Sequence, residues 1–112
     1  MSKKQYNLKI LASARDEIQE IARLHMALVG INSARKITTA LRKAVEHLST
    51  YPYLGVSIED RELSQQGYRK LVCGNYLCFY RLVDDTVFIY HIADGRTEYK
   101  HLFRKLPMVD ET

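Results

Sequence analysis

The spacing of apolar and polar positions predicts a strand and two helices in the first half of the chain. Residues 6–11 have the composition of a short strand. Apolar residues then recur every three or four positions in two stretches, the first ending at Gly30 and the second running from Asn32 or Ser33 to Pro52. Ser13 precedes Asp16 by three residues, which predicts a capping box at the start of the first helix. The short connection between the stretches predicts an antiparallel helical hairpin.

The second half alternates with a period of two. A polar connection over 52–67 precedes strand-like segments at 68–72, 76–83 and 86–93, and the pairs Gly74-Asn75 and Asp84-Asp85 between them predict two-residue hairpin turns. Residues 97–106 have helical spacing, with Thr97 as cap and Tyr99, Leu102, Phe103 and Leu106 on one side; His101 is expected to be solvated. The order β-α-α-β-β-β-α predicts one α+β domain over residues 1–112. We expect a mostly antiparallel four-stranded sheet, the helical hairpin on one face, and a short C-terminal helix.

If both turns have two residues, the side chains of the strands can be assigned to the two faces of the sheet. The face expected to carry the hairpin holds Leu71, Cys78, Leu82, Val87, Ile89 and Ala93, with Tyr76, Tyr80 and His91 among them. The other face holds Tyr68, Lys70, Val72, Leu77, Phe79, Arg81, Phe88, Tyr90 and Ile92. So many large apolar groups are unusual on a face open to water. Three occupants fit: an RNA strand stacked on the rings, a protein partner, or the C-terminal helix. The candidate partner- or RNA-binding residues are Tyr68, Phe79, Phe88, Tyr90 and Arg69.

Composition restricts the possibilities only a little. The chain has 112 residues and a hydrophobic fraction of 46%, enough for one domain with a core, and no apolar run that could cross a bilayer. No secretory signal precedes the first strand, so we expect a cytoplasmic protein with Cys73 and Cys78 as free thiols. The four histidines lack metal-ligand spacing, and neither a metal nor another cofactor is expected. The net charge of +4 is a weak indication of an anionic partner.

In this order the motifs resemble the RelE/ParE superfamily of bacterial toxins, over about residues 6–106. The resemblance is carried by "YNLKILASARDEIQEI", "ARKITTALRKAVEHLSTYPYLG", "GYRKLVCGNYLCFYRLVDD" and "VFIYHIADGRTEYKHL". It implies a growth-inhibiting toxin that a small cognate antitoxin protein wraps and neutralises, and it is compatible with a toxin–antitoxin hetero-oligomer. RelE-like members cut mRNA on the ribosome without a metal, using basic side chains and a proton-transfer group. ParE-like members bind DNA gyrase and trap it on cleaved DNA.

The resemblance implies a reduced nuclease site if the chain is RelE-like. Arg96 and Tyr99 match the family's arginine and tyrosine beyond the last strand, and Lys70 matches a basic position on an earlier strand. Arg81 supplies a further cation on the middle strand.

Three positions depart from the nuclease pattern. Leu77 follows Tyr76 where RelE-like enzymes carry an arginine, and Asp94 and Glu98 stand where relatives carry a histidine. Metal-free phosphoryl transfer needs several preorganised cations with an acid and a base, and losing one such group typically costs about a hundredfold or more. An inhibitor that acts by surface complementarity tolerates these losses. The sequence therefore favours gyrase inhibition, with mRNA cleavage as the alternative.

Overall fold

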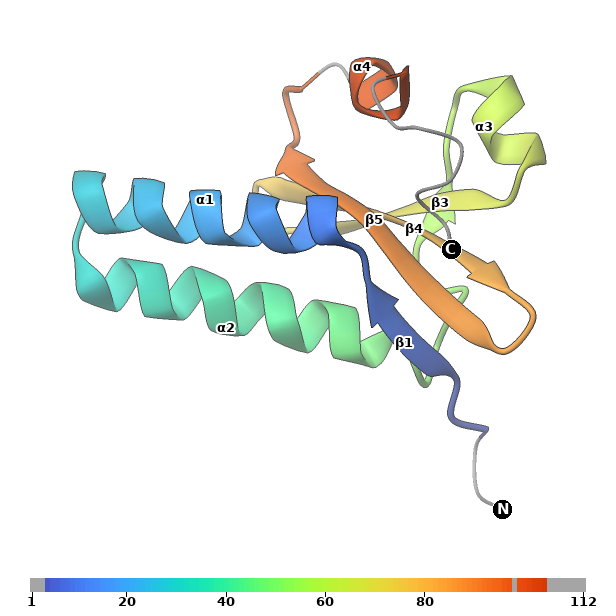
Figure 1. Ribbon diagram of the computed structural model, residues 1–112, viewed down its shortest axis with the longest axis horizontal. Helices are drawn as coiled ribbons and strands as arrows, with labels where there is room; N and C mark the ends of the chain where they lie inside the picture. The colour runs from blue at the N-terminus through green and yellow to red at the C-terminus, as the bar shows by residue number, and fades with distance from the viewer. Residues whose placement is uncertain (1–3, 98, 105–112) are drawn as a thin grey trace.

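The protein has the predicted α+β architecture, with a helical hairpin against one face of a five-stranded sheet (Figure 1). The structure, a computed structural model, describes residues 4–97 and 99–104. The elements are β1 (Asn7–Ile10), α1 (Ala12–Leu28), α2 (Ile31–His47), β2 (Val56–Ser57), α3 (Arg61–Gln65), β3 (Tyr68–Cys73), β4 (Tyr76–Val83), β5 (Thr86–Asp94) and α4 (Tyr99–Arg104). The strand order is β1-β5-β4-β3-β2, with β1 parallel to β5 and the other pairs antiparallel.

The hairpin packs on the sheet through small and branched apolar side chains. Leu41, Val45 and Leu48 recur at helical spacing on the second stretch and are almost fully buried, as is Ala14 on α1. They form one cluster with Cys78, Tyr80, Val87, Ile89 and Ile92 from the strands. The turn end of the hairpin extends well beyond the sheet (Figure 1). The part of the hairpin near the sheet therefore supplies the core, and its far end is left to solvent.

Both predicted hairpin turns have two residues. Cys73 pairs with Tyr76 across the first turn, and Val83 pairs with Thr86 across the second. Asp84 has a φ of 55° in the second turn, a left-handed conformation that aspartate tolerates better than most residues. With these turns the face assignment is confirmed for Leu71, Leu82 and Ile89, all of which pack in the hairpin cluster.

The assignment fails beyond the middle of β5, because a β-bulge adds one residue there. Phe79 pairs with His91 while Tyr80 pairs with Ile89, so Tyr90 has no partner on β4. The extra residue reverses the parity of every later position. Ile92, predicted on the open face, lies in the hairpin cluster. His91 and Ala93, predicted under the hairpin, lie on the opposite face instead.

Several local predictions also need correction. Ser13 lies inside α1 and does not cap it; its hydroxyl donates to the Tyr90 carbonyl at 2.7 Å, and the N-cap is Leu11. The second helix begins at Ile31, directly after Gly30. The supposed polar connection 52–67 contains β2, which makes the sheet five-stranded, and α3, whose cap is Asp60.

The predicted C-terminal helix is present in the described residues. Within the described residues it covers Tyr99–Arg104, and Thr97 precedes it. Glu98, Leu106 and the side chain of His101 lie outside what the structure describes. Tyr99, Leu102 and Phe103 pack against a second cluster on the face opposite the hairpin, formed by Leu11, Ile58, Tyr68, Phe79 and Tyr90. Of the three occupants that fit this face, the chain's own last helix is the one present.

Candidate functional site

The predicted aromatic surface lies under α4. Phe79, Tyr90 and Tyr68 are 0%, 1% and 6% exposed, and Phe88 is half-buried. The Tyr68 and Phe79 rings have their centroids 4.8 and 5.8 Å from that of Phe103, both edge to face. These contacts are the favoured aromatic geometry. A partner or an RNA base reaches the three buried rings only after α4 has moved.

The guanidinium of Arg81 is held among the same rings. Its Cζ lies 4.7 Å from the centroid of Tyr68 and 5.5 Å from that of Tyr90. Nη2 donates to the Tyr90 hydroxyl at 2.8 Å, and Nη1 donates to the Gln66 carbonyl at 3.3 Å. Cation–π contacts and hydrogen bonds therefore already satisfy this cation inside the fold.

Lys70 and Tyr99 are both tied to the loop before α3. Lys70 Nζ lies 3.3 Å from Glu59 Oε1, and its side chain is only 19% exposed. The Tyr99 ring stacks on Phe79 at 5.3 Å, and its hydroxyl accepts from the Asp60 amide at 3.3 Å. Each group thus has a structural partner within the chain.

Arg69, the remaining cation of the predicted surface, supports the loop before β2. Its Nη2 donates to the Gly55 carbonyl at 2.7 Å, and its Cζ lies 5.3 Å from the ring centroid of Tyr53. The side chain holds a loop in place and is not directed at an open cleft.

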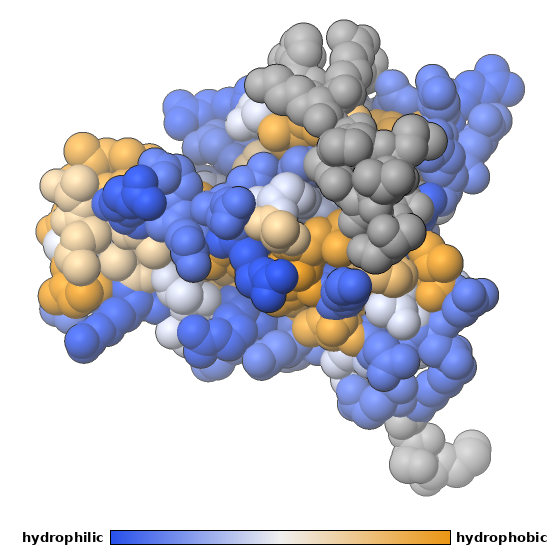
Figure 2. Space-filling view, viewed as in Figure 1, coloured by the Kyte–Doolittle hydropathy of each residue, from blue (hydrophilic) through white to orange (hydrophobic). Residues whose placement is uncertain are grey.

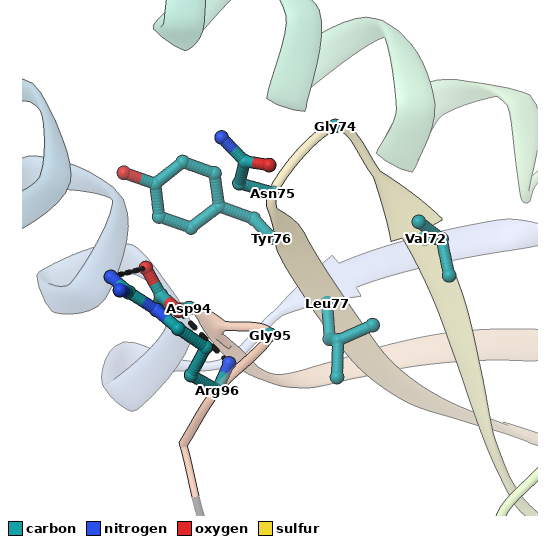
Figure 3. A pocket seen from close by; sticks show the side chains of 8 residues that line it. All are labelled: Val72, Gly74, Asn75, Tyr76, Leu77, Asp94, Gly95 and Arg96. Carbon is teal, nitrogen blue, oxygen red and sulfur yellow. Dashed lines mark hydrogen bonds and ion pairs between the residues drawn. The ribbon is translucent and has the colours of Figure 1, made fainter.

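Arg96 lies apart from these groups, in a pocket of about 480 Å³ at the end of β5 (Figure 3). Its Nε and Nη2 donate to the two carboxylate oxygens of Asp94 at 3.0 and 3.2 Å, and its backbone amide donates to the same carboxylate. These bonds lower the pKa of Asp94 and raise that of Arg96. The Arg96 side chain is 92% exposed, but its ion pair with the Asp94 carboxylate already neutralises its charge.

The candidates do not converge on one phosphate-sized site. Asp94 pairs with Tyr76 at one end of β4, and Phe88 pairs with Arg81 five residues further along. Five residues of strand span about 17 Å. Arg96 and Arg81 therefore belong to opposite ends of the sheet. Lys70 on β3 and Tyr99 on α4 lie between them, since Lys70 pairs with Phe79 and Tyr99 stacks on it.

Comparison with known families decides the identity. A family model described as "ParE toxin of type II toxin-antitoxin system, parDE" matches residues 8–99. The chain belongs to this family of toxins. The matched span runs from the second residue of β1 to the first residue of α4, so it includes the hairpin and all of the sheet except Asn7.

Solved structures of this toxin family's relatives share the fold. A chain of the chromosomal ParDE toxin–antitoxin system from P. aeruginosa is 19% identical, with a TM-score of 0.69; the match covers 82% of this chain and 98% of that one. A chain of the toxin–antitoxin complex RelBE2 from Mycobacterium tuberculosis is 18% identical with a TM-score of 0.60, covering 83% and 94%. Among curated proteins, no sequence matches significantly.

The structure of this ParE-family toxin contains a polar network that the sequence did not reveal. His25 Nδ1 lies 2.9 Å from Ser33 Oγ, and its Nε2 lies 3.0 Å from the hydroxyl of Tyr76, which lines the Arg96 pocket. The helical spacing of His25 was its only signal in the sequence. The network joins both helices of the hairpin to the end of β4.

A second histidine, His91, is buried and bonded to the first helix of the hairpin. His91 is 4% exposed, and its Nδ1 lies 2.9 Å from Glu17 Oε2. The other oxygen of Glu17 accepts from the Ile92 amide at 2.9 Å. Glu17 on α1 therefore fixes the part of β5 that follows the bulge.

A group of exposed apolar side chains lies at the turn of the toxin's helical hairpin. Leu28 and Val29 are each 74% exposed, and Figure 2 shows apolar surface gathered at that end of the molecule. The exposed large apolar residues here, called the hairpin tip below, are Leu24, Met26, Leu28, Val29 and Ile31. Contiguous apolar surface of this kind usually marks an interaction site.

Two other kinds of site are not found in the described part of the chain. No three histidine, cysteine or acidic side chains there are grouped so that they could hold a metal ion. None of the described helices is both long and apolar enough to span a membrane.

Proposed function

We propose that this toxin of a type II toxin–antitoxin system acts by binding DNA gyrase, and that an antitoxin protein neutralises it. The choice of target rests on the contacts that the predicted catalytic cations already make within the chain. Lys70 is paired with Glu59, Arg81 lies against two tyrosine rings, and Arg96 is paired with Asp94.

Metal-free cleavage of RNA demands a different arrangement. Stabilising the charge on a pentavalent phosphorus requires several cations aimed at one point, preorganised before the substrate arrives. Redirecting these three cations to one phosphate would break their present contacts and move two of them across most of the sheet. Binding of a protein target needs no such rearrangement.

The hairpin tip supplies a surface for that binding. Large exposed apolar side chains at the end of a rigid projecting element can be buried by a partner at little conformational cost. The match to the ParE family supports gyrase as the target. The two similar solved structures are titled as a toxin–antitoxin system and a toxin–antitoxin complex, which supports the antitoxin as the second partner.

One observation favours the alternative of a ribosome-dependent mRNA endonuclease. The Arg96 pocket combines an exposed guanidinium with Tyr76, whose hydroxyl is hydrogen-bonded to His25. A pocket of this kind contains a cation and a potential proton-transfer group. Arg96 is the one cation among the described residues that line it, whereas the charge of the transition state would have to be spread over several.

The test adds the purified toxin in parallel to a gyrase supercoiling reaction and to a translating extract. We expect inhibited supercoiling with accumulated cleaved DNA, and intact mRNA. The variants Arg96→Ala and Tyr99→Phe should leave gyrase inhibition within about threefold of wild type, as should Arg15→Ala, an exposed control on α1. Codon-register mRNA cuts that Arg96→Ala or Tyr99→Phe abolishes, with gyrase untouched, would establish the endonuclease instead.

Expression in cells provides the second test. Induction of the gene alone should arrest growth, and co-expression of the neighbouring small open reading frame should restore growth and give a co-purifying complex. The third possibility, suggested by the basic net charge, is a nucleic-acid-binding protein that is not toxic. Such a protein would cause no growth arrest.

A further inference from the structure

Most of the net positive charge of the chain is concentrated on α2. This helix contains four cations and one acid, Glu46, so it supplies +3 of the chain's net charge of +4. All four cations are exposed and are called the cationic face below: Arg35, Lys36, Arg42 and Lys43. In Figure 1, α2 forms the lower edge of the helical hairpin. The charge that the composition showed is therefore gathered on one outer surface.

The cationic face points away from the sheet. Its two arginines are seven residues apart, as are its two lysines, so each pair forms a row about two turns long. The exposed Thr39 lies between the two rows. Leu41 and Val45, which α2 buries in the hairpin cluster, lie on the opposite side of the helix. The four cations can therefore contact one partner at the same time.

The chain does not neutralise these charges. Among the described residues, none of the four cations forms an ion pair, whereas Arg23 on α1 is bridged to Glu20 at 2.9 Å. Lys70 on β3 and Arg96 after β5 are also paired with acids. Glu46 lies at the C-terminal end of the face and offsets only one of its charges. A surplus of this kind attracts an anionic partner.

The arrangement of the charges favours a linear polyanion over a lipid surface. Attraction to anionic lipids falls off within about 8–10 Å of a membrane. Arg42 lies about 16 Å along the helix from Ile31 of the hairpin tip, so it is beyond that range when the tip inserts. Arg35 and Lys43 are about 12 Å apart along the axis, and one strand of duplex DNA presents about three or four phosphates over this length.

We propose that the cationic face binds the phosphate backbone of duplex DNA. Its four cations neutralise phosphates along one strand, and the Thr39 hydroxyl donates to a phosphate oxygen. Such contacts read no base, so the binding is independent of DNA sequence. The choice of duplex DNA among the polyanions rests on the proposed function, since DNA is the substrate that gyrase holds.

The face adjoins the hairpin tip, which gives the DNA contact a role in target binding. Arg35 follows Ile31 by about one turn of α2. A toxin whose tip contacts gyrase therefore places the cationic face where it can bind the DNA on the enzyme. Two contacts made together strengthen binding beyond either one alone. The toxin should bind gyrase on DNA more tightly than gyrase without DNA.

Direct binding of DNA is measured by fluorescence anisotropy with a labelled duplex of mixed sequence at several salt concentrations. The test variant is Arg35→Ala/Lys36→Ala/Arg42→Ala/Lys43→Ala. Alanine removes the charges and preserves the helix. The control Arg15→Glu/Arg61→Glu makes the same change in net charge at exposed positions on α1 and α3. Unchanged circular dichroism and thermal midpoints confirm that both variants are folded.

The expected result is a salt dependence that only the test variant loses. Each neutralised phosphate contributes about −0.9 to the slope of log affinity against log salt, so wild type should have a slope of about −3. The test variant should bind at least about tenfold more weakly at low salt, with a slope near zero. The control should stay within about threefold of wild type. No binding by wild type at low salt, or equal losses in the two variants, would overturn the proposal.

Competition in the same assay distinguishes the other polyanions. The competitors are single-stranded RNA of the same length and vesicles that contain phosphatidylglycerol. Unlabelled duplex DNA should displace the labelled duplex at the lowest phosphate concentration. Stronger competition by the RNA or by the vesicles would assign the face to that polyanion and overturn the choice of DNA.

Gyrase inhibition is measured separately, so this proposal and the proposed function fail in different ways. Wild-type toxin that binds DNA through the face but leaves supercoiling intact would refute gyrase as the target and support the face. Toxin that inhibits gyrase, while the test variant binds DNA as tightly as wild type, would refute the face and support the target. Where both hold, half-inhibition requires at least about tenfold more of the test variant, but not of the control.

Discussion

The buried thiol of Cys78 makes the stability of the fold sensitive to alkaline pH. Cys78 lies on β4 in the hairpin cluster and is 1% exposed. Burial raises the pKa of this thiol from 9.0 to about 12, with the neighbouring Cys73 adding to the effect. The folded chain therefore keeps the proton over a range of pH in which the unfolded chain releases it.

The sign and size of the effect follow from linkage. Above the unfolded pKa of 9.0, ionisation stabilises only the unfolded state, so the free energy of unfolding falls as the pH rises. One pKa unit corresponds to about 1.4 kcal/mol, so the contribution lost by pH 10 is about 1.4 kcal/mol. The loss should continue until the pH reaches the folded pKa of about 12.

The measurement compares Cys73→Ala with Cys73→Ala/Cys78→Ala by urea denaturation, monitored by circular dichroism between pH 7 and pH 10. The first substitution excludes disulfide exchange, and the burial of Cys78 remains. Removing the Cys78 sulfur also costs packing, but that cost is the same at every pH and cancels in the difference. The stability advantage of the variant that retains Cys78 should shrink by about 1.4 kcal/mol over this range. A constant advantage would refute the reasoning.

Three further predictions test the tip, a close approach and the last helix. Leu28→Asp/Val29→Asp should abolish gyrase inhibition without lowering the thermal midpoint, since both side chains are 74% exposed. Inhibition by this variant at wild-type levels would exclude the tip as the target surface. Gly55→Ala should cost about 2–4 kcal/mol in urea denaturation, because the new Cβ would lie 2.5 Å from the Lys70 carbonyl oxygen. Phe103→Ala should cost about 1–3 kcal/mol in the same assay, since its ring contacts three others in the second cluster. An unchanged midpoint would mean that α4 does not stabilise the sheet.

The order of elements could be predicted because each depends on local rules. Helical spacing and Gly30 defined the hairpin, and the pairs at 74–75 and 84–85 defined the turns. Leu71, Leu82 and Ile89 were placed on the correct face because no residue is inserted between these positions and the turns. Local periodicity is sufficient wherever the pairing is regular.

The bulge at Tyr90 could not be predicted, because a distant contact accompanies it. The Tyr90 carbonyl accepts from Ser13, 77 residues earlier in the chain, and the run "FIYHIA" contains no glycine to mark an irregularity. The sequence instead suggested that Ser13 was a cap. The bulge therefore accounts for the wrong faces of His91, Ile92 and Ala93.

The contacts of the candidate site residues could not be predicted either. The sequence supplied the residue types, but Glu59 and Asp60 lie in a segment without periodicity, so their contacts with Lys70 and Tyr99 had no signal. Arg96 was singled out by resemblance, and its neutralisation by Asp94 depends on the geometry of the turn after β5. A sequence shows which side chains are charged, but it does not show whether a charge is already paired within the fold.

The parallel pairing of β1 with β5 has a consequence for synthesis of the toxin. Residues 7–10 pair with residues 86–89, so β1 cannot pair within the sheet until the ribosome has synthesised β5. Such non-local pairing delays folding, since the loop must close before any contact compensates for its entropy. A nascent or truncated chain that ends before Thr86 has β1 without a neighbour and lacks the strand to which Glu17 is anchored. Translation products that end before Thr86 therefore lack the β5 side chains of the core and cannot complete the toxin fold.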